Sequence, residues 1–108
     1  MSSALFSNPE DEKLSILATS TLKRTGAAQS AALRDSTGRT YVAIAISTPH
    51  LALDAIAAVF TVSMASQISG IEAVVVAGLK TCATEVIRSH SPQAAIFHIA
   101  QSGEISSL

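Results

Sequence analysis

The sequence has little cysteine, with Cys82 the single thiol among its 108 residues. One thiol excludes an intrachain disulfide framework and, within one chain, a metal cluster held by cysteines alone. The first eight residues contain neither a basic segment nor a long apolar run, so no secretory signal is visible. We therefore expect a cytoplasmic protein.

Charged residues are also few. The chain has 7 basic and 8 acidic residues, and their formal net charge is −1. This balance offers no basic surface to nucleic acid or to an anionic membrane, and we expect neither as a partner. Charged residues make up 14% of the chain, against about 25% in average proteins. A charge-poor surface rich in small residues favours contact with another copy, so we expect a homodimer or homotetramer, with a different protein partner as the other option.

At 108 residues the chain is long enough to bury one core, and we expect a single domain over residues 1–108. Residues 8–12, Asn-Pro-Glu-Asp-Glu, predict a helix start, because Asn caps, Pro suits the first position and acids favour the positive end of the helix dipole. Gly26 predicts the end of this helix.

Two extended runs follow, over residues 30–34 and 39–46. Between them, Asp-Ser-Thr-Gly at 35–38 is typical of a tight turn, with Gly38 suited to a positive φ. These features predict a β-hairpin. The second run becomes apolar on both faces towards its end, which indicates an inner strand covered on both sides.

The longest charge-free stretch runs from Ala55 to Ile71. Thr48 and Pro49 suit a helix cap and first position, and Gly70 suits a stop, so we predict a central helix ending near Ser69. Interspersed Ser and Thr side chains argue against a membrane span. A helix apolar nearly all round is buried, so we expect this one to be covered on most sides by its own chain or by copies of it.

The remaining third alternates strand and helix. Patterns of β-branched residues and breakers predict a strand over 71–77, a third helix over 81–89 and a strand over 94–100. Residues 105–108 form either a short last strand or a frayed end. Strands alternating with helices indicate parallel neighbours, whereas the hairpin is antiparallel. The fold class is therefore α/β, a three-layer α/β/α sandwich with a mixed sheet of four or five strands.

Several local patterns recur in one known family: Gly-Ala-Ala at 26–28, the acidic-Gly turn at 35–38, Tyr41, the apolar helix start at 53–58, and the run at 79–87 before and within the third helix. In these features and their order, nearly the whole chain resembles the cytidine deaminases, including the blasticidin deaminases. The resemblance implies the sandwich predicted above and sites built between subunits.

The resemblance also implies three Cys or His ligands to zinc and a Glu that shuttles protons. Asp54 stands at the first ligand position, Lys80 at the second and Ala83 at the third, while Ile56 replaces the Glu. Residues 44–48 hold no counterpart of the Asn-x-Glu with which the family grips its nucleoside. Ile cannot move a proton and charged Lys cannot donate to zinc, so we expect no catalytic residue, no metal and no cofactor.

The polar residues left there allow several interpretations. Asp54 and Lys80 form an ion pair in place of zinc, or both reach water independently. Cys82 is a reactive thiol in the first turn of a helix, where a thiol pKa falls, or a small buried hydrophobe. His50, Asp54 and Cys82 form a rearranged metal site, or His50 is simply polar in the first turn of the central helix.

The leading prediction is a non-catalytic cytidine deaminase-like protein, a pseudoenzyme acting as an oligomeric binding or assembly module. The alternative is a small-molecule enzyme or ligand binder that uses the former deaminase cleft with altered chemistry. The former active-site cleft contains His50, Asp54, Ile56, Lys80, Cys82 and Ala83.

Overall fold

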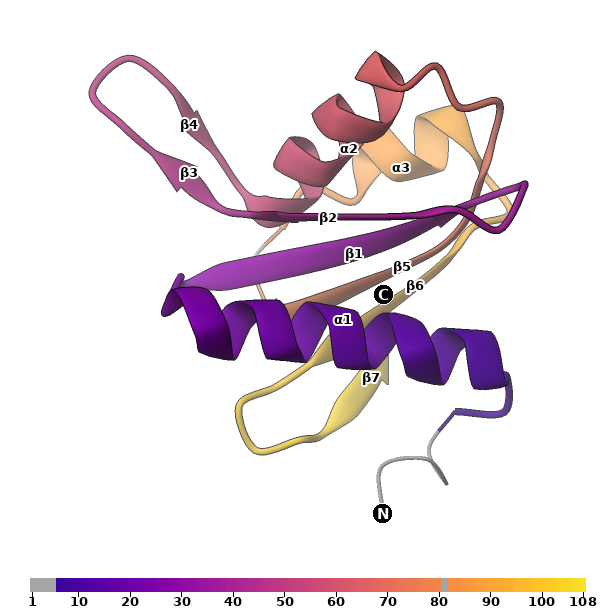
Figure 1. The fold of residues 1–108 in the computed structure, drawn as a ribbon, viewed down its shortest axis with the longest axis horizontal. Helices are drawn as coiled ribbons and strands as arrows, with labels where there is room; N and C mark the ends of the chain where they lie inside the picture. The colour runs from indigo at the N-terminus through magenta and orange to yellow at the C-terminus, as the bar shows by residue number, and fades with distance from the viewer. Residues whose placement is uncertain (1–5, 81) are drawn as a thin grey trace.

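A mixed five-stranded sheet lies between two helical layers in the computed structural model, which describes residues 6–80 and 82–108. The strand order is β2-β1-β5-β6-β7. The sheet strands are Gln29–Asp35 (β1), Thr40–Ile44 (β2), Ile71–Gly78 (β5), Ala95–Ile99 (β6) and Ile105–Ser107 (β7). The helices are Pro9–Thr25 (α1), Ala55–Ala65 (α2) and Glu85–His90 (α3). Figure 1 shows α1 on one face of the sheet and α2 with α3 on the other. The predicted three-layer α/β sandwich is confirmed.

Helix α1 follows its sequence signals closely. The Asn8 side chain accepts a hydrogen bond from the Glu10 backbone N–H at 2.8 Å and caps the first turn. Gly26 ends the helix in the left-handed region, with a φ of 67°, and its N–H donates to the Leu22 carbonyl. Leu14 and Ala18 are buried against the sheet. Both predicted ends of this helix are confirmed.

The predicted hairpin is present, since β1 and β2 pair antiparallel across a turn in which Gly38 has a φ of 94°. The prediction that the second strand is an inner strand is wrong. Strand β1 is fully buried between β2 and β5, whereas β2 lies at the sheet edge and is half-buried. Strand β2 is apolar on both faces because helices cover both, with Tyr41 packing on the α2 side and Val42 on the α1 side.

The predicted start of the central helix is also wrong. Thr48 lies in a turn, where its side chain and backbone bond Leu51, between the short strands Ile46–Ser47 (β3) and Ala52–Leu53 (β4). Helix α2 begins seven residues after Thr48, capped by Asp54. Thr and Pro suit a tight turn as well as a helix start, so the local pattern could not separate the two.

Helix α2 ends at Ala65, short of the predicted Ser69, because Gln67 adopts a left-handed φ of 60°. The helix packs on the sheet and beside α3, where the rings of Phe60 and His90 are in contact, and its remaining side is exposed. Ile56 and Val59 are fully buried against the sheet, whereas Val62 is 43% exposed. The outer side of α2 is therefore exposed in this chain, and the prediction of a helix covered on most sides is not met by its own chain.

The second half follows the predicted order. Strand β5 runs along the middle of the sheet and pairs parallel with β6, and β6 pairs antiparallel with β7. The helix predicted over 81–89 is shorter, since α3 begins at Glu85, and its predicted first residue, Thr81, lies outside the described residues. In the described ranges, no helix combines the length and apolar character that a membrane crossing requires.

Candidate functional site

Two of the residues predicted for the former cleft, Asp54 and Ala83, lie where the N-terminus of α2 meets the connection between β5 and α3. Asp54 occupies this junction. Its Oδ1 accepts a hydrogen bond from the Ala57 backbone N–H at 2.7 Å, which caps α2, and its Oδ2 accepts one from the Ala83 backbone N–H at 2.6 Å. A single carboxylate thus ties α2 to the segment before α3, and each of its oxygens accepts a backbone bond.

A second clamp at the same junction comes from Gln29, which is 2% exposed at the start of β1. Its Oε1 accepts from the Ala55 N–H at 2.8 Å, and its Nε2 donates to the Leu79 carbonyl at 2.7 Å. The role of Gln29 was not predicted from the sequence. An amide in a run of buried strand residues was the available signal, because a buried amide requires partners.

Strand β5 ends at this junction with Gly78. Any other residue there would force the neighbouring backbone to shift. Gly78 has a φ of 101°, and a Cβ built there would lie 2.4 Å from the Ala28 carbonyl oxygen. The close approach of the two backbones brings Leu79 near Ala28, whose carbonyl accepts the Leu79 N–H at 3.2 Å. The junction is therefore packed backbone against backbone.

The other residues of the predicted zinc site do not supply ligands. Ile56 is fully buried in the apolar cluster between α2 and the sheet, Ala83 presents a methyl group, and Lys80 is exposed. The ion pairs found in residues 6–80 and 82–108 do not include Lys80. The ion-pair hypothesis expected the Asp54 carboxylate to bind the Lys80 ammonium. The carboxylate binds backbone N–H groups instead.

Cys82 precedes α3 and so does not lie in the first turn of that helix as predicted. It is partly buried against the apolar cluster beside α2. Burial, together with the negative charges of Asp54 and Glu85, raises the pKa of the thiol above its ordinary value. A raised pKa disfavours the thiolate, so the surroundings match a small hydrophobe and not an activated nucleophile.

His50 does not join the cluster proposed with Asp54 and Cys82. It lies exposed in the turn between β3 and β4, a hairpin that projects beyond the sheet in Figure 1. In the part of the chain that the structure describes, no three His, Cys, Asp or Glu side chains gather as a metal site would require. One carboxylate committed to backbone N–H groups, beside a lysine and an alanine, does not fit the tetrahedral zinc that the resemblance implies.

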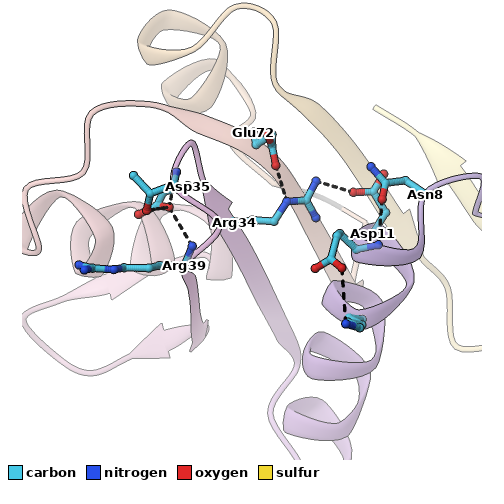
Figure 2. Close-up of polar contacts among 9 residues, drawn as sticks. Asn8, Asp11, Arg34, Asp35, Arg39 and Glu72 are labelled. Atoms are coloured by element: carbon cyan, nitrogen blue, oxygen red, sulfur yellow. Dashed lines mark hydrogen bonds and ion pairs between the residues drawn. The ribbon is translucent and has the colours of Figure 1, made fainter.

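Charged residues gather instead at the opposite end of the sheet (Figure 2). Arg34, 5% exposed on β1, donates from Nε to Glu72 at 2.6 Å and from Nη2 to Asp11 at 2.8 Å. Burial alone would lower the pKa of this guanidinium, but the bonds and charges of both acids outweigh it and raise the pKa. This cluster ties α1, β1 and β5 together and was not foreseen from the sequence.

A family model described as cytidine deaminase-like matches residues 7–103. The chain belongs to the cytidine deaminase-like family. A solved structure, the crystal structure of cytidine deaminase from Mycobacterium leprae, is similar over 89% of this chain and 91% of that chain, with 16% identity and a TM-score of 0.66. At this identity the likeness establishes the fold. A comparison with curated protein sequences found no match.

Membership of the cytidine deaminase-like family confirms the resemblance drawn from the sequence. It also explains which sequence signal located α2 correctly. The resemblance drawn from the sequence placed the start of the second helix at residues 53–58. In the structure the helix begins at Ala55, inside that range. The general capping signals at Thr48 placed it wrongly.

Proposed function

We propose that this protein is a non-catalytic member of the cytidine deaminase-like family that acts as an oligomeric binding or assembly module. The geometry of Asp54 carries the proposal. Its two oxygens accept the N–H groups of Ala57 and Ala83, at the position where the family resemblance places the first zinc ligand. The carboxylate joins the two helical segments through hydrogen bonds, which is a structural role and needs no metal.

Zinc deamination needs a metal-activated water and an acid–base group beside it. Ile56 lies where that group would stand and is fully buried among apolar side chains. Cys82 has a raised pKa, which disfavours a replacement nucleophile. These properties favour a pseudoenzyme over an enzyme with altered chemistry in the same cleft.

The outer side of α2 supports the assembly role. No charged residue occurs from Ala55 to Ile71, and Val62 is 43% exposed on α2. Leu51, in the β3–β4 turn, is 53% exposed. An exposed apolar helix side without charge is typical of a surface that meets a partner, and a second copy supplies the same uncharged surface. We therefore propose a homodimer or homotetramer assembled through α2.

Catalysis is tested by incubating the purified chain with cytidine and zinc and following the loss of cytidine absorbance. We expect no deamination above that of a blank without protein. If deamination occurs, the variants Lys80→Ala, Cys82→Ala and Asp54→Ala decide its origin. Loss of the activity in these variants, with folding retained, would overturn the proposal in favour of the alternative enzyme.

Assembly is tested by light scattering coupled to size-exclusion chromatography. We expect the wild-type chain to be a dimer or tetramer and Val62→Asp to shift it towards monomer. Ile16→Asp is the matched control, because Ile16 is 57% exposed on α1, on the other side of the sheet. A monomeric wild-type chain, or equal effects of both variants, would contradict assembly through α2.

A further inference from the structure

A pocket of about 320 Å³ lies between the β1–β2 turn and the loop that follows α2. It lies at the opposite end of the sheet from Asp54, and none of the junction residues described above lines it. Its lining is largely polar: Asp35, Thr37, Arg39, Tyr41, Ser66, Gln67, Ile68 and Ser69. Its volume is at the lower end of the range of about 300–1,000 Å³ found for small-molecule sites.

The buried wall of the pocket is the Asp35 carboxylate, which is 3% exposed. Its Oδ1 accepts three bonds, from the Thr37 N–H, the Thr37 hydroxyl and the Arg39 N–H. Its Oδ2 accepts one bond, from the Tyr41 hydroxyl, and this bond is long at 3.3 Å. Oδ2 therefore retains capacity to accept a stronger donor.

Among the residues that the structure describes, the donors to Asp35 are neutral. Burial raises the pKa of this carboxyl, but the bonds from Thr37, Arg39 and Tyr41 outweigh burial and lower it, so the group is ionised at neutral pH. No cation of residues 6–80 and 82–108 lies within ion-pair distance of it. Buried charges in proteins are usually paired, so a cationic group beside Oδ2 would be stabilised.

The opposite charge is available at the rim. Arg39 is exposed, and its guanidinium forms no hydrogen bond or ion pair with any residue that the structure describes. Figure 2 shows its side chain extending on the side of the turn away from Arg34. A free guanidinium presents a planar fork of N–H donors that suits a carboxylate. The pocket thus offers one carboxylate and one guanidinium, neither of which forms an ion pair within the described residues.

We propose that this pocket binds a small zwitterion of the α-amino acid class, with its ammonium on Asp35 Oδ2 and its carboxylate on Arg39. A simple cation would be repelled by Arg39 and a simple anion by Asp35, whereas a zwitterion pairs both. The pocket volume and its hydroxyl lining favour short side chains. The site is independent of the former zinc cleft, so its failure leaves the proposed function untouched.

The ligand class is tested by isothermal titration calorimetry of the full chain with glycine, L-alanine and L-serine. The matched controls for L-serine are ethanolamine, which lacks the carboxylate, and glycerate, which lacks the ammonium. We expect the amino acids to bind and each control to bind about tenfold more weakly or worse, because each loses one charge-assisted contact. Absence of binding by all three amino acids, or equal binding by a control, would overturn the proposal.

The position of the site is tested with Arg39→Gln, which leaves the backbone N–H of Arg39 free to hold the turn. We expect this variant to lose binding about tenfold while melting like the wild-type chain. Arg24→Gln, at the exposed end of α1, is the matched control and should bind normally. Asp35→Asn should also weaken binding, but it loosens the turn, so Arg39→Gln decides. Unchanged binding in Arg39→Gln would overturn the proposal.

Discussion

Asp54 and Asp35 lie at opposite ends of the same sheet and are bound in different ways. Both oxygens of Asp54 accept short bonds from backbone N–H groups of two separate segments. Asp35 directs three bonds to one oxygen within a single turn and leaves the other with one long bond. Both oxygens of Asp54 are therefore occupied by hydrogen bonds within the fold, whereas Oδ2 of Asp35 can accept a further hydrogen bond. Whether a carboxylate at a family's metal position can still bind metal therefore depends on the hydrogen bonds that its oxygens already accept.

The largest effect is expected at the Asp35 end, in the neighbouring Arg34 cluster. Asp11→Ala should destabilise the chain by about 3 kcal/mol, because it leaves a buried guanidinium short of a partner. Glu72→Ala is the control. It removes a bond to the same guanidinium, but the Glu72 side chain is 56% exposed, so water can take its place and the loss should cost about 1 kcal/mol or less. Urea denaturation measures both, and equal losses would contradict the buried cluster.

At the other end, Asp54→Ala should cost about 2 kcal/mol, because a helix cap and a second backbone N–H lose their acceptor together. Asp54→Ser separates the two roles, since serine still caps α2 but is too short to reach Ala83. It should cost less than the alanine variant. Lys80→Ala should leave stability unchanged and show no coupling to Asp54→Ala in a double-mutant cycle. Strong coupling would restore the ion-pair hypothesis.

Acid should weaken the Asp35 turn. The pKa of Asp35 is lowered in the folded chain, so its contribution to stability is present above the ordinary pKa of aspartate, about 4. That contribution is lost as the pH falls through the lowered value. The stability of Asp35→Asn should therefore depend less on pH over this acidic range than that of the wild-type chain. Identical pH profiles in urea denaturation would contradict this assignment.

The smallest effect concerns Cys82, whose pKa is raised by burial and then by Asp54 and Glu85. At neutral pH the folded chain should react with a disulfide reagent more slowly than the same chain in urea, because less thiolate is present. Glu85→Gln removes one negative charge and should speed the reaction a few-fold without touching the Asp54 cap. A folded thiol that reacts faster than the unfolded one would contradict the raised pKa.

The parts of the fold that the sequence predicted well depend on local signals. Asn8 and Gly26 bound α1 through contacts within a few residues, and the turn at Gly38 needs only its own backbone conformation. The start of α2 combines a local cap, the bond from the Ala57 N–H to Asp54, with contacts between distant residues. Gln29 binds the Ala55 N–H and Asp54 binds the Ala83 N–H, and no local pattern encodes either contact.

The candidate site shows the same division. The family resemblance identified Asp54, Ile56, Lys80 and Ala83 as replacements of the zinc motif, because motif positions are read along the chain. It could not show that the Asp54 carboxylate accepts hydrogen bonds from the Ala57 and Ala83 backbone N–H groups. The Asp35–Arg39 pocket could not be predicted, because the loop after α2 supplies half of its lining residues. The turn pattern at residues 35–38 does not indicate which distant segment packs beside the turn.

We propose that Asp54 joins α2 to the segment before α3 by hydrogen bonds alone, without a metal ion, at the position where the family resemblance places the first zinc ligand. Plasma mass spectrometry of untagged protein, purified without chelator, tests it most directly. We predict a folded protein with zinc far below one equivalent per chain. Near-stoichiometric zinc, lost in Asp54→Ala, would contradict the claim and reopen hydrolytic chemistry at this junction.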